Sequence, residues 1–183
     1  MHWKVLSTEY LYSHPPYFIA RKDVCERPDG KIIPAYYVVE LPESVITFPV
    51  IDDKVLMIKQ YRHPVQQISW EFPGGFADDG ENNATAALRE LKEETGYVFN
   101  QCHYLGKIAG NPGILNNFTH VYITEGTYTK TTQHFDGNED IEMQLFSFRE
   151  IMQMLQQNQI IQSLHANACY MALLHLNKLR VNL

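Results

Sequence analysis

Three glutamates in one short segment are the residues whose types and spacing could do chemistry. Glu90, Glu93 and Glu94 stand at positions i, i+3 and i+4 within residues 89–94. In a helix, which turns by about 100° per residue, this spacing places the three carboxylates in one sector about 100° wide. Like charges side by side destabilise a helix unless something offsets them. A bound divalent cation would do so, and such oxygen ligands suit Mg²⁺ or Mn²⁺ rather than zinc.

A solvated acidic helix face is the alternative interpretation of the three glutamates taken alone, because charge runs usually lie on the surface. The surrounding residues form a longer pattern, which consists of Gly75, Glu81, Arg89, Glu90, Leu91, Glu93, Glu94 and Gly96, followed by Tyr97. Five residues separate the first two members, and seven separate the next two. This pattern resembles the Nudix box, G-x5-E-x7-R-E-U-x-E-E-x-G-U, in which U is a bulky aliphatic residue. Tyr97 departs from the last U, which is a packing position, so the departure affects no catalytic residue.

Segments outside the box resemble the ADP-ribose pyrophosphatase subgroup of the Nudix family. Residues 60–62 and 71–75 look like the segment that precedes the box in that subgroup. Pro112 follows the box at an offset typical of the same subgroup, and residues 138–141 resemble its acidic loop before the last strand. The resemblance covers roughly residues 17–176.

The resemblance implies an enzyme that hydrolyses nucleoside diphosphate-linked compounds, here ADP-ribose to AMP and ribose 5-phosphate. It also implies a Mg²⁺ site, with Mn²⁺ as an alternative ion, held by Glu90, Glu93, Glu94 and the backbone carbonyl of Gly74. Metal ions would neutralise the pyrophosphate oxygens, lower the pKa of a bound water and align the attack. Glycine at this turn lets the backbone approach a metal where a side chain would obstruct it.

Further catalytic roles follow from the same resemblance. Arg89 is expected to pair with a box carboxylate and to fix its orientation. Glu81 either joins the metal network or ties its loop to the helix. The candidate general base is Glu139, in the acidic loop 136–140, and Glu93 is the alternative. A solvated turn remains the alternative interpretation of that loop.

Substrate contacts are predicted from the flanking motifs. Arg62 is the candidate for a direct phosphate contact, because a planar guanidinium offers two parallel hydrogen bonds to phosphate oxygens. Glu71 is expected to be a structural partner of an arginine, and Pro112 marks the substrate subgroup. Asn116 and Asn117 depart from the pattern of many ADP-ribose enzymes. Another nucleoside diphosphate-linked compound, a nucleotide sugar or a dinucleotide, therefore remains the alternative substrate, and a non-catalytic ADP-ribose sensor is a further alternative.

Several elements must position these residues. A helix is predicted over residues 83–94, because an apolar stripe runs along one face and Gly96 stands where a C-terminal cap belongs. A capping box predicts a second helix from Ser147 to about Gln157, and a last helix spans about residues 161–178. Residues 1–16 are expected to be irregular because they end in a proline pair. Strands are predicted near residues 17–23, 31–41, 44–51, 54–61, 103–109, 119–124 and 142–146.

This order of elements predicts a mixed α/β fold, and the resemblance specifies a Nudix-type α/β/α sandwich with a mixed sheet plus N-terminal antiparallel strands. We expect residues 1–45 to form an N-terminal β segment that builds a homodimer interface and contacts the base of the substrate. Residues 46–183 would form the Nudix hydrolase domain. Four aromatic residues of the first segment could stack on a base or pack in an interface: Trp3, Tyr10, Tyr17 and Phe18.

The composition excludes other classes of protein. The chain has 183 residues, of which 45% are hydrophobic, as expected for one folded domain. Its 15 basic and 21 acidic residues give a net charge of −6, which disfavours binding to nucleic acid. No run of 18 apolar residues and no signal peptide is present, so we expect a cytoplasmic protein without a membrane partner. Three scattered cysteines predict reduced thiols, not a disulfide framework or a zinc site.

Overall fold

The computed structural model describes residues 2–133 and 141–179. These residues form two compact units, one from the chain up to residue 43 together with residues 109–118, and the other from residues 44–108 together with those from 119 onward. With the expected boundary at residue 45, residues 109–118 would belong to the second domain. They join the first unit because the Ile114 carbonyl accepts a hydrogen bond of 2.8 Å from the Val39 amide.

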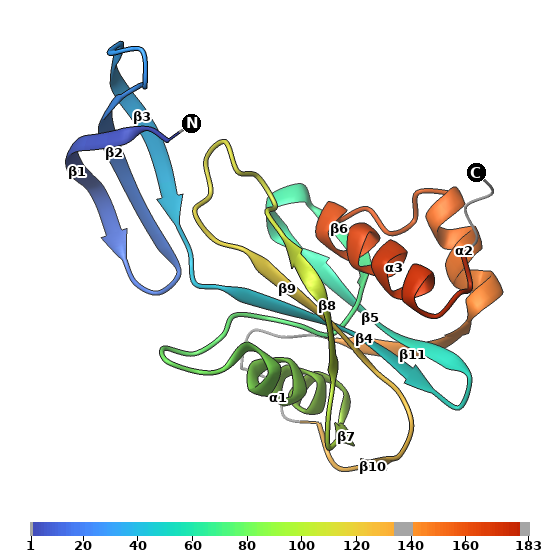
Figure 1. The fold of residues 1–183 in the computed structure, drawn as a ribbon. Coiled ribbons are helices and arrows are strands. Elements are labelled where there is room, and N and C mark those ends of the chain that lie inside the picture. The colour runs from blue at the N-terminus through green and yellow to red at the C-terminus, as the bar shows by residue number, and fades with distance from the viewer. Residues whose placement is uncertain (1, 134–140, 180–183) are drawn as a thin grey trace. The chain divides into compact units, whose positions relative to one another are not determined.

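The N-terminal unit contains a three-stranded antiparallel sheet with the order β1-β2-β3 (Figure 1). Its strands are β1 (Lys4–His14), β2 (Phe18–Glu26) and β3 (Ile32–Glu40). The expectation that residues 1–16 are irregular is wrong, because β1 pairs with β2 along most of its length. The proline pair lies in the turn that follows β1, where it breaks no strand hydrogen bond.

The second unit contains a mixed six-stranded sheet with the order β11-β5-β4-β9-β8, in which β6 pairs with β5. Among the described strands of this sheet, β4 and β9 run parallel, and the other pairs are antiparallel. Asp52 and Asp53 form the tight hairpin between β4 and β5, with φ of 47° and 59°. The strands are β4 (Ser44–Ile51), β5 (Lys54–Arg62), β6 (Gln67–Glu71), β8 (His103–Ile108), β9 (Thr119–Thr124) and β11 (Glu142–Ser147).

Helices cover both faces of this sheet, as predicted for a sandwich (Figure 1). Helix α1 (Asn83–Thr95) packs on one face, where Val45 of β4 meets Ala86 and Ala87. Helices α2 (Phe148–Gln156) and α3 (Ser163–His175) cover the other face. There the next residue of β4, Ile46, joins a large apolar core. Alternate residues of one strand therefore point into the two layers. Three short elements complete the unit: the 3₁₀ helix η1 (His63–Val65), and the strand pair β7 (Tyr97–Phe99) and β10 (Tyr128–Lys130).

Two predicted caps, Gly96 and the capping box of Ser147, are confirmed, whereas the last helix is shorter than the predicted residues 161–178. The Asn82 side chain accepts a hydrogen bond of 2.9 Å from the Ala84 amide at the start of α1. At its end, Gly96 adopts φ of 73°, as a C-terminal cap requires. The expected capping box of Ser147 and Glu150 begins α2. Within the described residues, no helix is long and apolar enough to cross a membrane.

Candidate metal and catalytic site

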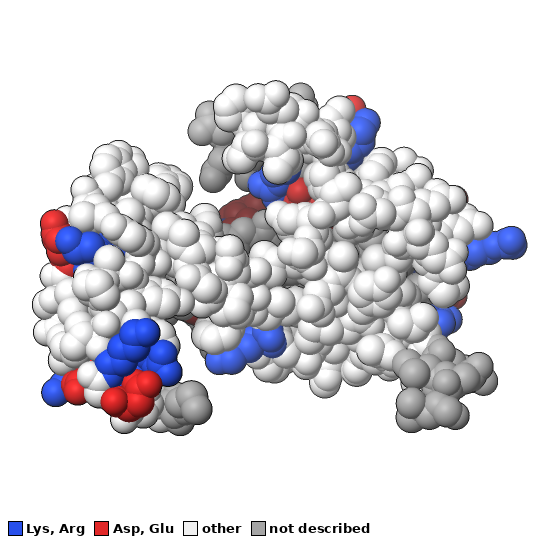
Figure 2. Space-filling view, turned by 90° about the horizontal axis from the view of Figure 1, so that it is seen from above, with Lys and Arg blue, Asp and Glu red and all other residues white. Residues whose placement is uncertain are grey.

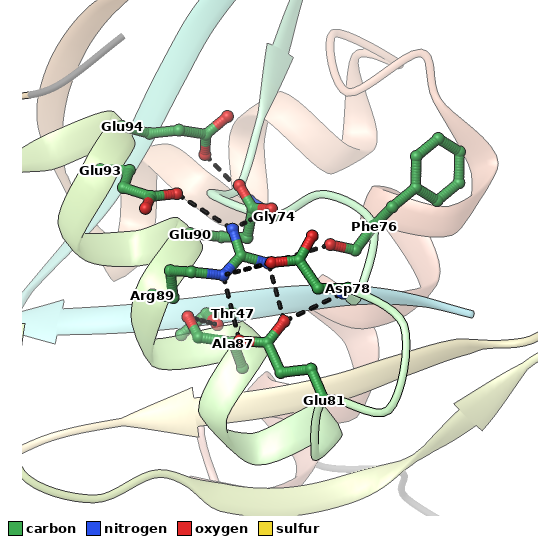
Figure 3. Close-up of polar contacts among 10 residues, drawn as sticks. All are labelled: Thr47, Gly74, Phe76, Asp78, Glu81, Ala87, Arg89, Glu90, Glu93 and Glu94. Atoms are coloured by element: carbon green, nitrogen blue, oxygen red, sulfur yellow. Dashed lines mark hydrogen bonds and ion pairs between the residues drawn. The ribbon is translucent and has the colours of Figure 1, made fainter. Parts of the chain in front are cut away.

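The three glutamates of the predicted metal site lie on α1 (Figure 3). Glu94 and Glu90 lie against the turn that contains Gly74 and Gly75. The three glutamates differ in their access to solvent. Glu94 is buried, with 3% of the residue exposed. The Glu90 side chain is 14% exposed, whereas that of Glu93 is 40% exposed. The site thus grades from a buried carboxylate to one that water reaches readily.

Arg89 donates hydrogen bonds to four residues of this site (Figure 3). Its Nη1 donates to Glu90 at 2.9 Å and to Glu93 at 3.0 Å. Its Nε and Nη2 donate to the two oxygens of Glu81 at 3.1 and 2.9 Å. Nη2 also donates to the Phe76 carbonyl at 3.1 Å. The hydrogen bond to Glu81, with help from the other two carboxylates, raises the pKa of Arg89 against the opposing effect of burial. A guanidinium serves this purpose because its five donors diverge in a fixed plane.

Glu81 joins the loop before α1 to the helix. Its carboxylate accepts two hydrogen bonds from Arg89 and one of 3.0 Å from the Asp78 amide. The hydrogen bond from Arg89 is the main reason that the pKa of Glu81 is lowered. The ion pair of Glu81 and Arg89 therefore joins the loop to the helix. This link fixes the position of the α1 glutamates relative to the glycine turn.

The two glycines of the turn are required by close neighbours. A Cβ atom on Gly74 would lie 2.1 Å from the Val45 carbonyl oxygen, because this segment runs directly against β4. A Cβ atom on Gly75 would lie 2.6 Å from the Glu90 carboxylate. The Gly74 amide donates to Glu94 at 2.9 Å. The carboxylates of Glu90 and Glu94 thus rest against consecutive residues of one turn.

Backbone hydrogen bonds hold the glycine turn against β4. The amides of Val45 and Thr47 donate to the carbonyls of Gly75 and Pro73, both at 2.8 Å. The Gly74 amide donates to Glu94 instead. The backbone of this turn therefore lies between β4 and the carboxylates of α1.

The donor set fits a hard divalent cation, since it combines carboxylates with a backbone oxygen. Among the described residues, no three His, Cys, Asp or Glu side chains already converge on one point as metal ligands do. The hydrogen bonds explain this. Glu90 and Glu93 turn toward Arg89 Nη1, and Glu94 turns toward the Gly74 amide.

A second polar cluster lies at the ends of β5 and β6. Arg62 donates through Nε to Glu71 at 2.9 Å, and its Nη2 contacts the other oxygen of the same carboxylate. His165 of α3 completes the cluster, with Nε2 at 3.2 Å from Glu71. Glu71 is fully buried. The expected pairing of Glu71 with an arginine is present. His165 was not among the predicted site residues, because no spacing links it to residues about 90 positions earlier.

The pKa of Glu71 predicts a pH dependence of stability. Burial alone would raise this pKa, but the hydrogen bonds from Arg62 and His165 outweigh it and lower the value from 4.5 to about 2. A group with a lowered pKa stabilises the fold fully above its unfolded value, and this contribution disappears as the pH falls through the folded value. We expect the wild type to lose about 3 kcal/mol from this source between about pH 5 and pH 2.

The measurement is urea unfolding of the wild type and Glu71→Gln across this pH range. The difference in unfolding free energy between the two proteins should shrink as the pH falls. Glu125→Gln, at an exposed position, is the control for loss of one carboxylate. A constant difference between wild type and Glu71→Gln at all pH values would contradict this account.

The other predicted site residues lie elsewhere in the chain. Pro112 belongs to residues 109–118, which are part of the N-terminal unit. In this segment the Gly113 carbonyl accepts a hydrogen bond of 3.2 Å from the Tyr36 hydroxyl. Glu139, the candidate general base, lies outside the described residues. All four aromatic residues proposed for base stacking are exposed in the N-terminal unit: Trp3, Tyr10, Tyr17 and Phe18.

Charged side chains form separate groups on the face shown in Figure 2. Blue and red groups, some of them mixed, lie on a face that is otherwise mostly white, without a continuous stripe of Lys and Arg. In the N-terminal unit the ion pairs join Arg21 to Asp23 and Glu40, Lys22 to Glu9, and Arg27 to Asp29. Positive charge on these elements is therefore locally compensated.

Comparison with known proteins adds independent information. Residues 40–166 match the family model described as NUDIX domain, and residues 3–39 match the model described as nucleoside diphosphate sugar hydrolase N-terminal domain. The methanol dehydrogenase activator of Bacillus methanolicus is 30% identical, over 87% of this chain and 86% of that protein. The ADP-ribose pyrophosphatase of Bacillus subtilis is 27% identical, over 86% of this chain and 85% of that protein.

A solved structure shares the fold. The crystal structure of an ADP compounds hydrolase superposes with a TM-score of 0.85 and covers 97% of this chain and 96% of that chain. The sequence identity is 21%. At this identity the likeness concerns the arrangement of helices and strands. It agrees with the predicted α/β/α sandwich with additional N-terminal strands.

Proposed function

The chain belongs to the Nudix family and is a Nudix pyrophosphohydrolase, and we propose that it hydrolyses ADP-ribose to AMP and ribose 5-phosphate with Mg²⁺. The observation that carries this proposal is the set of α1 carboxylates that Arg89 and Gly74 hold beside the glycine turn. The substrate class rests on two relatives. One is the Bacillus subtilis ADP-ribose pyrophosphatase, and the other is the ADP-sugar pyrophosphatase of Mus musculus, which is 45% identical over 37% of this chain and 31% of that protein.

The proposed reaction assigns a task to each residue. A divalent cation, when bound, would neutralise phosphate oxygens and lower the pKa of a water molecule; Mn²⁺ is the alternative ion. Glu90, Glu93, Glu94 and the Gly74 carbonyl would hold it. A general base, Glu139 or Glu93, would accept a proton from the attacking water. The water oxygen bonds to one phosphorus while the bridging P–O bond breaks, which releases AMP and ribose 5-phosphate.

Arg62 would contact the substrate. The Nε and Nη2 groups of Arg62 contact Glu71, while the arginine side chain remains 39% exposed. Guanidinium groups bind phosphate well because their donors match the spacing of two phosphate oxygens. Pro112 is proposed to shape the loop that meets the rest of the substrate. These assignments predict that Arg62 contributes mainly to KM.

The test is product analysis with a panel of ADP-ribose, nucleotide sugars, dinucleotides and nucleoside triphosphates, each with Mg²⁺, with Mn²⁺ and with a chelator. We expect the highest kcat/KM with ADP-ribose and no turnover with the chelator. A higher value for a nucleotide sugar or dinucleotide would replace the proposed substrate by the alternative. Binding of ADP-ribose without turnover of any compound would support the sensor instead of the enzyme.

A homodimer built through the N-terminal sheet is also proposed. Every residue of β1 is exposed, among them Leu6 and Leu11 at 44% and 51%. Exposed apolar side chains in this number favour an interface with a partner. We expect light scattering to give twice the chain mass of 21.2 kDa for the wild type, and a lower mass for Leu6→Ser/Leu11→Ser. Leu174→Ser, a similarly exposed position on α3, is the matched control. A monomeric wild type would contradict the proposal.

A further inference from the structure

We propose that His165 is a positioning residue, which holds the Arg62 guanidinium in its orientation by fixing Glu71 between them. The consequence for substrate binding rests on the proposed function, in which Arg62 contacts a phosphate. The three side chains come from three elements, α3, β6 and β5, so the orientation of Arg62 depends on a helix that contributes no residue to the metal site. None of the motifs in the sequence assigns a role to His165.

The first step is the hydrogen bonding of the imidazole. His165 stands in the first turn of α3 and is 5% exposed. Its Nδ1 accepts a hydrogen bond of 3.0 Å from the Phe72 amide. A ring nitrogen that accepts from an N–H carries no proton. The remaining proton therefore resides on Nε2, which donates to Glu71 Oε2 at 3.2 Å. The two partners together select one neutral tautomer of the ring.

The second step is the effect on Glu71. One of its oxygens accepts from Arg62 Nε at 2.9 Å, and the other meets Arg62 Nη2, His165 Nε2 and, at 3.5 Å, Gln60 Nε2. Arg62 and Gln60 both belong to β5, so a carboxylate held by them alone could turn together with the arginine. The His165 donor comes from a different element and opposes such a turn. Glu71 is fully buried, so no solvent competes for these contacts.

The third step concerns Arg62. Its side chain is 39% exposed and leaves the end of β5. An arginine that is held in one orientation before binding loses less conformational freedom when it binds a phosphate. Loss of the His165 donor should therefore weaken ground-state binding more than the chemical step. The expected result is a rise in KM that exceeds the change in kcat.

Two amide variants separate the two hydrogen bonds of the ring. His165→Gln places a donor near the position of Nε2 and keeps the contact to Glu71. His165→Asn places an acceptor near the position of Nδ1 and keeps the contact to Phe72 but not the one to Glu71. His175→Gln, at an exposed position on the same helix, is the control. We expect KM for ADP-ribose to rise about tenfold in His165→Asn, and less than about threefold in His165→Gln and in the control.

A second readout does not depend on activity. The Arg62 Nε–H is hydrogen-bonded to Glu71, so its exchange with solvent, followed by ¹⁵N NMR, reports how firmly the guanidinium is held. We expect exchange about tenfold faster in His165→Asn and unchanged in His165→Gln. If the wild type hydrolyses no ADP-ribose but exchange follows this pattern, the proposed function fails while the positioning role stands.

Other outcomes would overturn the role of His165. Equal protection of the Arg62 Nε–H in both variants would show that Glu71 holds the arginine alone. Equal falls in the melting temperature of both variants, with an unchanged KM, would also overturn the inference, because they would indicate that His165 only packs in the core. If His165→Asn does not fold, the cycle of Glu71→Gln, His165→Ala and the double variant decides, because alanine removes the donor to Glu71: independent effects on exchange overturn the inference, and non-additive effects support it.

Discussion

Glu94→Gln is expected to reduce kcat/KM for ADP-ribose by at least about a hundredfold while the protein keeps its fold. Loss of residues that only orient metal ligands costs about 10- to 100-fold, so loss of a ligand charge should cost at least as much. The substitution preserves shape. The glutamine Oε1 can still accept the hydrogen bond that the Gly74 amide gives to Glu94. What is removed is the negative charge of the most buried of the three carboxylates.

The measurement is steady-state kinetics with a titration of Mg²⁺, supported by thermal unfolding to verify the fold. The concentration of Mg²⁺ required for half-maximal activity should rise as well. Glu125→Gln removes the same charge at an exposed position and should change kcat/KM by less than about twofold. A Glu94→Gln enzyme within about threefold of the wild type would exclude Glu94 as a metal ligand.

Alanine at the two neighbouring glycines is expected to give two different failures. At Gly75 the added methyl group meets the end of a flexible side chain, the Glu90 carboxylate, at 2.6 Å. Glu90 can swing away, so the fold should persist while activity falls by at least about tenfold. At Gly74 the methyl group meets a backbone carbonyl at 2.1 Å, and that carbonyl belongs to β4 in the centre of the sheet. Overpacking against backbone should cost at least about 3 kcal/mol of stability.

Chemical denaturation and kinetics on the same two preparations distinguish these outcomes. Gly75→Ala should retain most of its unfolding free energy, and Gly74→Ala should lose it or fail to accumulate as folded protein. Equal stability of the two variants would mean that the segment can move away from β4. Full activity in Gly75→Ala would mean that the position of Glu90 does not matter for the reaction.

The parts of the fold that were predictable are those with local signals. Helix α1 was found because its apolar stripe, its acidic sector and Gly96 lie within one short stretch. Strand β1 was not predicted, because all of its residues are exposed and burial therefore imposes no alternation of apolar and polar residues on its sequence. The proline pair also suggested irregular structure, whereas it forms the turn after the strand.

The candidate site divides in the same way. The box glutamates and Arg89 form a pattern along one helix, which spacing reveals. His165 meets Glu71 only because α3 packs on the sheet, and no pattern in the chain records that contact. The need for glycine at residue 75 likewise depends on Glu90, which lies 15 positions later in the sequence.

The N-terminal unit is discontinuous, since residues 109–118 belong to it although they are encoded within the other unit. The chain therefore passes between the units at three places, near residues 43, 108 and 118. Recombination that exchanged only the first part of the gene would replace β3 with that of a homologue but keep the original residues 109–118. The contact between the Val39 amide and the Ile114 carbonyl would then join residues of different parentage. The two stretches should consequently be inherited together, and hybrids that separate them should fold poorly.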